Sequence, residues 1–511
     1  MTELPADAKR LRVPPGGVTV RMYRQGLGDA FLLAFGSPEP NETRYMLIDC
    51  GVHGAQKGGG ITLEAAVDDI AQATGGCLDV VVATHEHTDH LSGFVREASH
   101  FVGEGIEIDE LWLAWTENLR DPLARRLHKG RAAAKEAVRK ALARLKEKVR
   151  EGRTRLATAS VSGFSGFFEM ASPEGVDFTA MGKRLGVRDP EKVTGNELAL
   201  AVLKERANRK RYFRPGGEPQ QIPGVHNARA YILGPPRDEQ LLKRSDPSRG
   251  SRSEVYFTAD SSLLSFVAAV HGGAQDDEML KELADPFDER HRRGRDWASK
   301  QKFFKDTYDH GHFTWRQIED DWLLTAETLA LHLDSDTNNT SLALALEVGA
   351  PGSGRVLLFP GDAQVGNWLS WRQPTWRVGQ QEVNAEDLLQ RTILYKVSHH
   401  ASHNGTVKRD AEGQPFGLEL MPQGMMAMIP VDHAAASKLR GWDMPYEPLY
   451  EVLKEKTNNR ILRSDDLDRG IRRPGLRESA VPEMADVRWR RSRETKADGN
   501  SLYYDVSFAA D

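Results

Sequence analysis

The chain has very few cysteines for its length. Its 511 residues include only Cys50 and Cys77, which excludes a scaffold held together by several disulfides. Because we expect a cytosolic protein, where thiols stay reduced, we interpret both cysteines as small buried apolar side chains. Cys50 lies in the segment M-L-I-D-C-G near the motif described below, which leaves a redox or ligand role open for it.

Long apolar runs and a secretion signal are also missing. No stretch approaches the roughly eighteen consecutive apolar residues of a membrane span, and the opening M-T-E-L-P-A-D-A-K-R-L-R has no apolar core. We therefore expect a cytoplasmic protein without a membrane segment. The apolar fraction of 39% and the charged fraction of 28% are usual for a folded globular chain. The net charge of −5 argues against a surface that is basic everywhere but allows a local basic groove.

Three catalytic signatures are absent. The sequence contains no G-x-S-x-G, no P-loop and no convincing dinucleotide fingerprint. The catalytic classes that depend on these motifs therefore have no basis in the sequence.

The first part of the chain predicts a sheet with a helix beside it. Segments 18–24, 30–35 and 44–51 are strand-length runs separated by Gly, Pro and Asn, which favours an antiparallel meander. A helix is expected at 63–73. Two further strands are predicted, and the first of them is apolar nearly throughout, as expected of a strand covered on both faces; the two are 78–84 and 108–115.

The later part of the chain predicts a second group of strands. Each candidate is a short apolar run bounded by turn residues; the candidates are 229–236, 254–260, 341–348, 355–362, 392–400, 425–431 and 460–464. The first two are isolated in a region rich in charge, Gly and Pro. Together with the first group, they suggest sheets covered by helices on both sides.

A long amphipathic helix is predicted at 128–151, with an apolar stripe formed by Val138, Leu142, Leu145 and Val149. We expect 1–120 to form the first half of a core, 121–225 to form a helical basic insertion, and 226–511 to form the second half. A further insertion is expected within the second half, at about 240–337.

The segment Thr84-His85-Glu86-His87-Thr88-Asp89-His90, directly after an apolar strand, is the strongest chemical signal. In an extended segment, residues two apart point the same way, so His85 and His87 can hold one ion. Asp89 and His90 then turn toward a second position. Imidazole and carboxylate ligands together suit zinc, with manganese or iron also open. The alternative is a solvated polar loop.

A glycine-aspartate turn follows one of the later strands, in F-P-G-D-A. Gly-Asp after a strand is common turn chemistry. Beside the histidine motif, however, we expect Asp362 to bridge two metal ions, with one oxygen facing each cation. This arrangement would neutralise part of the repulsion between the ions.

A third motif, K-V-S-H-H-A-S-H-N-G, also lies at the end of a predicted strand. Adjacent residues of a strand point to opposite sides, so only one of the two adjacent histidines is expected to ligate. We prefer His399 as a ligand of the second metal. We interpret His400 as a neighbour of the ligands or a residue that faces the substrate, and His403 can equally be exposed.

The order and content of these motifs resemble the metallo-β-lactamase superfamily, and within it the hydrolase domain of ComEC-type competence proteins. Weaker motifs carry the narrower resemblance: Q-G-L-G-D-A-F-L-L, Y-I-L-G-P-P, N-N-T-S-L-A-L, K-V-S-H-H-A-S-H and R-I-L-R-S-D-D. The resemblance covers roughly 18–105 and 229–466. It implies a four-layer αβ/βα sandwich, with two divalent metal ions, most often zinc, at the edge between its two sheets.

The chain departs from that family pattern in three places. The glycine of H-H-G-S is Ala401, and the later His-Pro is Met444-Pro445. No clear counterpart exists for the separate histidine that many superfamily members carry before the bridging aspartate, although the ComEC-like branch often lacks it. Five other histidines can still fold into the site, with the pair in His-Gly-His the most tempting; they are His226, His271, His310, His312 and His332.

Acidic and polar residues near these motifs are candidates for orienting the ligands. Asp29 and Asp49 lie at positions that resemble conserved acidic points of the family, so either can hold the free ring nitrogen of a ligand histidine. A turn or cap role is the alternative. Asn339 and Ser341 either hydrogen-bond the site or shape a turn.

The motifs predict hydrolysis by an activated water. Two cations that share a water lower its pKa to roughly 7 and stabilise the charge on a phosphoryl or carbonyl oxygen. Asp89 or Asp362 would orient the water, and His400 would face the substrate beside them. No covalent intermediate is needed.

Basic stretches that contain aromatic residues suggest the substrate. They lie at 204–214, 292–297 and 488–493, and their residues Arg209, Lys210, Arg211, Arg490 and Arg491 are the candidate nucleic-acid contacts. With the ComEC-like resemblance, these stretches favour phosphodiester hydrolysis of DNA or RNA. The rivals are a hydrolase of a small phosphoester, lactone or thioester, and a non-enzymatic binding module stabilised by metal. The sequence identifies no protein partner.

Overall fold

The computed structural model describes most of the chain, and the description below is limited to those residues. They are 10–37, 43–53, 62–96, 98–101, 105–150, 177–187, 190, 193–245, 293, 295–308, 335–410, 412–440, 442–466, 488–491 and 501–509. Side chains are not described at 98–99, 137–150, 295, 438–440 and 488–491. The chain divides into two units, of which the first contains Met1–Ala124, Glu169–Ser248 and Asp336–Asp511, and the second Arg125–Phe168 and Arg249–Ser335.

The first unit contains an eight-stranded sheet with the order β16-β17-β1-β2-β3-β4-β5-β6. The strands from β16 to β3 are antiparallel to their neighbours, whereas β3, β4, β5 and β6 run parallel. The predicted meander is therefore confirmed as β1, β2 and β3. The bounds are β1 Val18–Tyr23, β2 Ala30–Gly36, β3 Thr43–Cys50, β4 Cys77–Ala83, β5 Glu107–Ala114, β6 Ala207–Phe213, β16 Arg488–Arg491 and β17 Tyr503–Phe508.

The same unit contains a seven-stranded sheet with the order β15-β14-β13-β10-β9-β8-β7. Its strands are antiparallel from β7 to β10 and parallel from β10 to β15. A separate hairpin pairs β11 with β12. The bounds are β7 Gln220–Gln221, β8 Ala228–Ile232, β9 Leu344–Val348, β10 Arg355–Phe359, β11 Trp376–Val378, β12 Gln381–Val383, β13 Thr392–Lys396, β14 Met426–Ile429 and β15 Ile461–Arg463.

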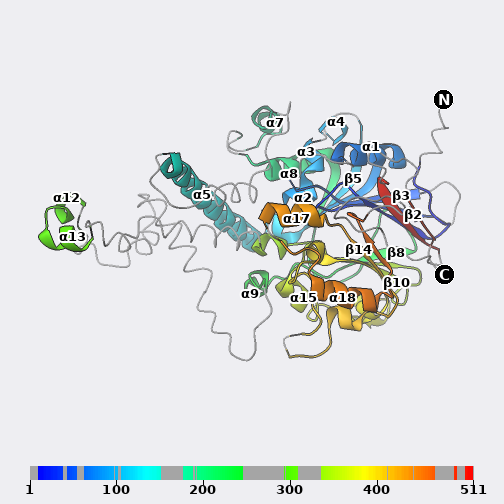
Figure 1. Ribbon diagram of the computed structural model, residues 1–511. Coiled ribbons are helices and arrows are strands. Elements are labelled where there is room, and N and C mark those ends of the chain that lie inside the picture. Colours follow the sequence, from blue (N-terminus) through cyan, green and yellow to red (C-terminus); the bar gives the residue numbers. More distant parts are fainter. Residues whose placement is uncertain are drawn as a thin grey trace. The chain divides into compact units, whose positions relative to one another are not determined.

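Helices of the first unit lie on the outer faces of its two sheets. The α-helices are α1 Leu63–Thr74, α2 Thr88–Leu91, α3 Gly93–Arg96, α4 Ala98–Phe101, α5 Pro122–Arg150, α7 Phe178–Arg184, α8 Gly195–Arg206, α9 Glu239–Leu242, α12 Arg295–Ala298, α13 Lys302–Thr307, α15 Val365–Ser370, α16 Ala385–Gln390, α17 His433–Arg440 and α18 Glu447–Lys456. The described 3₁₀ turns used below are η2 Trp115–Glu117 and η5 Ser398–Ala401. In Figure 1, α1, α3 and α8 cover one sheet and α15 and α18 cover the other.

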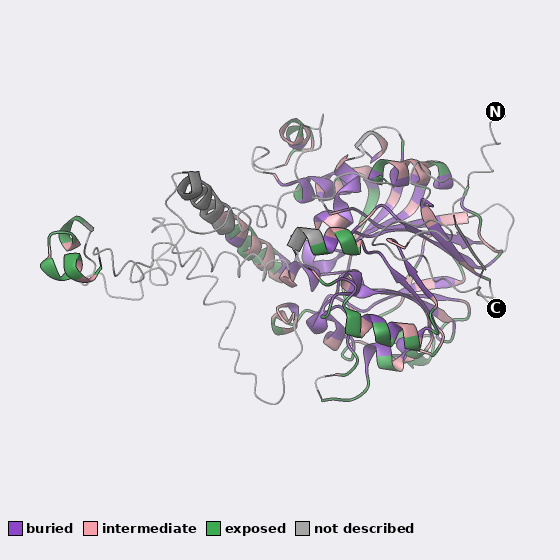
Figure 2. Ribbon diagram, in the orientation of Figure 1, coloured by how far each residue is buried: buried purple, intermediate pink, exposed green. Residues whose placement is uncertain are grey.

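Three apolar layers hold these elements together, and alternation along the strands produces them. Leu32 faces the layer beneath α1 and α8, whereas its neighbour Leu33 faces the layer between the two sheets. In the second sheet, Leu344 contributes to that central layer and Ala345 to the layer beneath α15, α16 and α18. Figure 2 shows that both sheets consist almost wholly of buried residues. The expected four-layer αβ/βα metallo-β-lactamase sandwich is therefore confirmed.

The sequence-based prediction missed three strands of the first sheet, which are β6, β16 and β17. β6 has the sequence A-N-R-K-R-Y-F and carries three consecutive exposed residues, because it is the edge strand beside β5. Its helix α8 packs on β5 and β6. Both elements lie in the range 121–225 that we expected to be an insertion, yet they belong to the first sheet and its helix layer. The domain boundaries as a whole stay a prediction.

The second unit contains most of the predicted long helix, which the structure places at Pro122–Arg150 as α5. α12 and α13 also belong to it. The strand predicted at 254–260 lies outside the described residues. In the part of the chain that the structure describes, no helix combines the length and apolar character needed to cross a membrane.

A buried arginine on β1 forms ion pairs with the neighbouring strand β17 and with helix α1. The guanidinium of Arg21 on β1 lies 2.7 Å from a carboxylate oxygen of Asp505 on β17, and 2.5 Å from one of Asp69 on α1. Arg21 and Asp505 are almost completely buried. Without the arginine, Asp505 would be a buried charge without its guanidinium partner.

Replacing Arg21 with methionine is therefore expected to destabilise the protein by about 3–5 kcal/mol. The matched control is Arg209→Met, because the ion pair of Arg209 with Asp109 is exposed and such pairs contribute little. Unfolding by guanidinium chloride measures both variants. Equal midpoints for R21M and R209M would contradict this assignment.

Candidate metal centre

The histidine motif leaves the first sheet at the carboxyl end of β4. Thr84 follows the strand, His85 and Glu86 form a bend, and α2 begins at Thr88 with His87 as its N-cap. The carbonyl oxygen of Thr84 accepts a hydrogen bond from the backbone N–H of Leu342, which leads into β9. This bond joins the edge of one sheet to the edge of the other, and the site forms at that junction.

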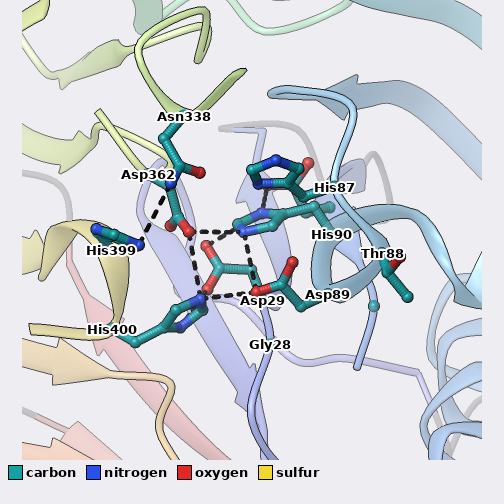
Figure 3. A network of polar contacts seen from close by, with 12 residues as sticks. Gly28, Asp29, His87, Thr88, Asp89, His90, Asn338, Asp362, His399 and His400 are labelled. Atoms are coloured by element: carbon teal, nitrogen blue, oxygen red, sulfur yellow. Dashed lines mark hydrogen bonds and ion pairs between the residues drawn. The ribbon is translucent and has the colours of Figure 1, made fainter. Parts of the chain in front are cut away.

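Four side chains from distant parts of the chain meet there. Asp29, His90, Asp362 and His400 each offer one ligand atom, and these atoms all lie within 4.8 Å of one another. All four residues are buried. Asp362 Oδ2 lies 3.1 Å from His90 Nε2 and 3.3 Å from His400 Nε2, as Figure 3 shows. The predicted convergence of Asp362 with the histidine motif is therefore present in the structure.

Asp89 extends this cluster. One of its carboxylate oxygens lies 3.1 Å from His400 Nε2 and 3.9 Å from His90 Nε2. Its side chain is 16% exposed, compared with 2% for Asp29 and for Asp362. Asp89 is thus the carboxylate of the cluster that solvent reaches most readily.

His85 and His87 lie next to the cluster. His85 Nε2 is 3.0 Å from His87 Nδ1, and the ring of His85 is centred 4.2 Å from the ring of His90. Ser341 connects the pair to the aspartate turn, because its hydroxyl lies 3.2 Å from His85 Nδ1 and accepts a hydrogen bond from the backbone N–H of Asp362. Of the two roles left open for Ser341, the contact with the site is the one observed.

Three histidines are anchored through Nδ1, which leaves Nε2 for the centre of the site. His400 Nδ1 donates to the carbonyl oxygen of Pro430 at 2.7 Å. His90 Nδ1 lies 2.8 Å from Asp49, and His85 Nδ1 lies 3.0 Å from the hydroxyl of Thr84. Metal-ligating histidines are usually held in this way, with the second nitrogen free to bind the ion.

Asp49 positions two parts of the motif at once. Besides its contact with His90, its carboxylate accepts hydrogen bonds from the backbone N–H and the hydroxyl of Thr84, at 2.8 and 2.6 Å. The predicted orienting role of Asp49 agrees with this geometry. Asp29 differs from its prediction, because it lies inside the ligand cluster instead of only behind a histidine.

A buried lysine that the sequence-based prediction gave no role holds two of the carboxylates. Lys396, at the end of β13, places its ammonium 2.5 Å from Asp29 Oδ2 and 3.2 Å from Asp362 Oδ1. It also donates to the carbonyl oxygen of Gly361 at 2.8 Å. Because Lys396 occupies Oδ1 of Asp362, only Oδ2 faces the histidines. The bridging role of Asp362 between two cations stays a prediction.

The backbone after β13 decides which of the two adjacent histidines enters the cluster. His399, His400 and Ala401 all have positive φ angles, of 48°, 52° and 63°, so the strand rule used for the prediction does not apply. His399 faces Asn404 at 3.2 Å and Asn338 at 3.4 Å instead. The ligand position that we assigned to His399 is taken by His400.

Charge and burial set the protonation of the site. Burial lowers the pKa of His87 to about 4 and that of His85 well below its ordinary value, so both imidazoles are neutral, as ligation requires. Burial also lowers the pKa of His400, but Asp362 and Asp89 outweigh it and raise that pKa to about 10. The carboxylates thus attract positive charge to this cavity, which is the electrostatic setting of a cation site.

The donor set fits divalent metal ions. His90 Nε2 and Asp29 Oδ1 are buried but make no hydrogen bond in the structure, and both belong to residues of the cluster. Imidazole nitrogens and carboxylate oxygens in this mixture suit zinc, manganese or iron. The residues that fit are Asp29, Asp89, His90, Asp362 and His400 around one position, and His85 and His87 beside it.

Other candidates from the sequence lie elsewhere. His226 is exposed and precedes β8, at the end opposite the site, and His403 is also exposed. Asn339 accepts hydrogen bonds from the backbone N–H groups of Gln364 and Asn367, so it shapes the turn after Asp362. His271, His310, His312 and His332 lie outside the described residues. Cys50 is buried, but Cys77 is exposed at the first position of β4, so its predicted burial is wrong.

The basic candidates of β6 face acidic partners. Arg209 lies 2.8 Å from Asp109 and 3.2 Å from Glu110, and Arg211 lies 3.4 Å from Glu110. Lys210 is exposed. Their nucleic-acid role stays a prediction, as does that of Arg490 and Arg491, which form part of β16 and whose side chains are not described.

Two arginines, Arg214 after β6 and Arg237 after β8, share one carboxylate. Asp121, which is buried, forms ion pairs at 2.7 Å with Arg214 and with Arg237. Hydrogen bonding from Arg237 holds the pKa of Asp121 well below its ordinary value. The two guanidinium groups are 58% and 40% exposed, so they remain accessible to an anion. Arg214 lies in the basic stretch 204–214, and nothing in the sequence distinguished its role from that of Arg209.

Comparison with known proteins identifies one domain. Residues 24–160 match the family model described as the metallo-beta-lactamase superfamily. That range contains β2 to β5 and the whole histidine motif. No curated protein matches the chain. The chain therefore carries a metallo-β-lactamase superfamily domain, as the sequence motifs implied.

Asp49→Asn tests how the ligands are oriented. The amide can keep the fold but loses the charge that holds His90 and one of the acceptor contacts to Thr84, so metal affinity should fall by about 10- to 100-fold. The measurement is competition for zinc against a chromophoric chelator. Asp79→Asn is the control, because Asp79 bonds Tyr45 and Arg44 on the first sheet instead of the site. Equal affinity in D49N and D79N would refute the role of Asp49.

Proposed function

Because residues 24–160 form a metallo-β-lactamase superfamily domain, we propose that the protein is a metal-dependent hydrolase of phosphodiesters, with DNA or RNA as substrate. Two divalent metal ions, zinc first and manganese or iron as alternatives, complete the site. The buried cluster around Asp362 supports the hydrolase part of the proposal. The resemblance of K-V-S-H-H-A-S-H and its companion motifs to ComEC-type hydrolase domains supports the substrate part.

Each ligand has a place in this proposal. Asp89, His90 and His400 would hold one ion, and His85 and His87 would hold the other. Asp362 would contribute its Oδ2, because Lys396 contacts its Oδ1. When bound, the ions lower the pKa of a water and stabilise charge on a phosphoryl oxygen.

The protein's own residues orient the reactants. Asp89 is the most exposed carboxylate of the cluster, so it is the residue best placed to accept a hydrogen bond from the attacking water. Asp362 and His400 are the other two residues that we assign to catalysis, because His400 contacts both Asp89 and Asp362. No serine or cysteine nucleophile is needed.

The observation that carries the substrate class is the arginine pair at the same edge of the first sheet. β4, β5 and β6 are parallel, so their carboxyl ends lie side by side. The histidine motif follows β4, Asp121 follows β5 through η2, and Arg214 follows β6. Two guanidinium groups share one carboxylate and leave a net positive charge, which suits the backbone phosphates of a nucleic acid.

Arg237 enters from the second sheet. It follows β8, its guanidinium lies 4.4 Å from the ring centre of Trp115, and the indole N–H of Trp115 donates to the carbonyl oxygen of Pro235. These contacts fix the arginine at the junction of the two sheets. Arg209, in contrast, lies five residues before Arg214 along an extended strand, a distance of roughly 16 Å.

Elemental analysis of the purified protein, coupled to a panel of nuclease and phosphodiesterase substrates with and without chelator, tests the proposal. We expect bound metal and chelator-sensitive cleavage of oligonucleotides. Similar cleavage of a generic phosphodiester without binding of oligonucleotides would instead indicate a small-molecule hydrolase. Absence of metal-dependent hydrolysis across the panel would indicate a binding module.

His87→Ala and Asp362→Asn remove ligands from the two ends of the site. Both variants should fold, lose bound metal and lose more than about 100-fold in activity, since changes behind the ligands alone give 10- to 100-fold effects. Metal content and initial rates are measured together. His226→Ala is the control, because His226 is exposed and lies away from the site. Normal activity in H87A or D362N would contradict the ligand assignment.

Arg237→Met tests the phosphate contact. One charge-assisted hydrogen bond contributes about 1.5 kcal/mol, so KM for an oligonucleotide should rise about tenfold, with little change for bis(4-nitrophenyl) phosphate. The dependence of log KM on log salt should also weaken by about one unit. Arg44→Met is the matched control, because Arg44 forms a partly exposed ion pair with Asp79 and lies at the amino end of β3, away from the site. An equal effect on both substrates would rule out a role in binding the nucleic acid strand.

A further inference from the structure

The two metal positions differ in the number of described ligands. Asp89, His90 and His400 surround one position, and Asp362 adds its Oδ2. His85 and His87 contribute the only imidazoles found at the other position among the described residues. A catalytic zinc site usually has three protein ligands. With Asp362 Oδ2, the position beside His85 and His87 reaches three protein ligands, one fewer than the position beside Asp89, and so keeps an open coordination position that a further oxygen can take.

Asn338 carries a buried oxygen that has no partner. Its side chain is 1% exposed, and Oδ1 makes no hydrogen bond in the structure. Burying an amide oxygen without a partner is destabilising, because the oxygen gives up its hydrogen bonds to water. The nitrogen of the same amide lies 3.4 Å from His399 Nε2. The amide nitrogen thus has a hydrogen-bonding partner, whereas the amide oxygen makes no hydrogen bond.

The contacts of His399 fix the orientation of this amide. His399 Nε2 lies 3.4 Å from the amide nitrogen of Asn338, and His399 Nδ1 lies 3.2 Å from the amide oxygen of Asn404 and 3.4 Å from the amide nitrogen of Gln364. An amide nitrogen can only donate a hydrogen bond, so the NH₂ group of Asn338 faces the ring of His399. Asn338 Oδ1 therefore points away from His399.

The backbone of Asn338 lies in a turn next to the metal centre. Its carbonyl oxygen accepts a hydrogen bond from the N–H of Ser341, which forms a tight turn. The hydroxyl of Ser341 contacts both His85 and the backbone N–H of Asp362. Figure 3 shows the oxygen of Asn338 turned away from His399, toward the side on which His87 lies.

We propose that Asn338 Oδ1 is a ligand of the metal position held by His85 and His87. The inference depends on the metal centre of the proposed function but not on the choice of substrate. An amide oxygen is a neutral, hard ligand, which suits manganese better than a third imidazole does and holds zinc less tightly. This position is therefore the weaker and more exchangeable of the two, and His399 is a positioning residue that orients its amide ligand.

Manganese binding to the full chain tests the proposal without any activity assay. Equilibrium dialysis should give two classes of Mn²⁺ site, and electron paramagnetic resonance should show a spin-coupled pair. Asn338→Ala should lose the weaker class and give the spectrum of a single uncoupled ion, with the tighter class unchanged. Asn384→Ala is the control and should keep both ions, because the side chain of Asn384 caps α16, outside the cluster.

Two further variants test the proposal if Asn338→Ala does not fold. Asn338→Asp supplies an oxygen at the same place and should keep the coupled pair. Asn338→His should tighten zinc at the weaker position by about tenfold or more. Two unchanged classes of site in N338A, or loss of the pair in N338D, would overturn the proposal. Two bound ions without phosphodiester cleavage would contradict the proposed substrate and leave Asn338 supported as a ligand.

Discussion

The placement of one carboxylate, that of Asp362, is the constraint on which the site depends. Its Oδ1 is held by the ammonium of Lys396, and its Oδ2 lies against His90 and His400. These partners come from both sheets, and the backbone bond from Leu342 to Thr84 brings the sheet edges together. A buried carboxylate with a lysine on one oxygen has only the other oxygen left for a cation. The lysine also offsets part of the negative charge that four nearby aspartates bring.

This constraint divides the centre into unequal halves. The half beside Asp89 and His400 is rich in carboxylate, whereas the half beside His85 and His87 has two neutral imidazoles and the amide of Asn338 within the described residues. Such asymmetry means that one ion can remain bound while the other exchanges. The arginine pair on Asp121 adds positive charge at the carboxyl ends of neighbouring strands. In the proposed function, a polyanion bound there would have its phosphates directed toward the metal centre.

The sequence predicted much of the fold because apolar alternation marks strands that face two layers. It missed β6, whose exposed basic residues are typical of a loop, because an edge strand faces solvent. The dense spacing of His85 to His90 identified the centre, since few structures other than a metal site need that pattern. It could not choose His400 over His399, because the choice depends on positive φ angles that no local rule predicts. The role of Lys396 depends on long-range packing and was invisible for the same reason.

Anomalous diffraction from crystals of the protein grown with zinc or manganese tests most directly whether Asp362 and the histidines bind metal. We expect one ion within bonding distance of Asp362 Oδ2, His90 Nε2 and His400 Nε2, and a second beside His85 and His87. Anomalous density elsewhere in the molecule, with none between Asp362 and these histidines, would contradict this expectation.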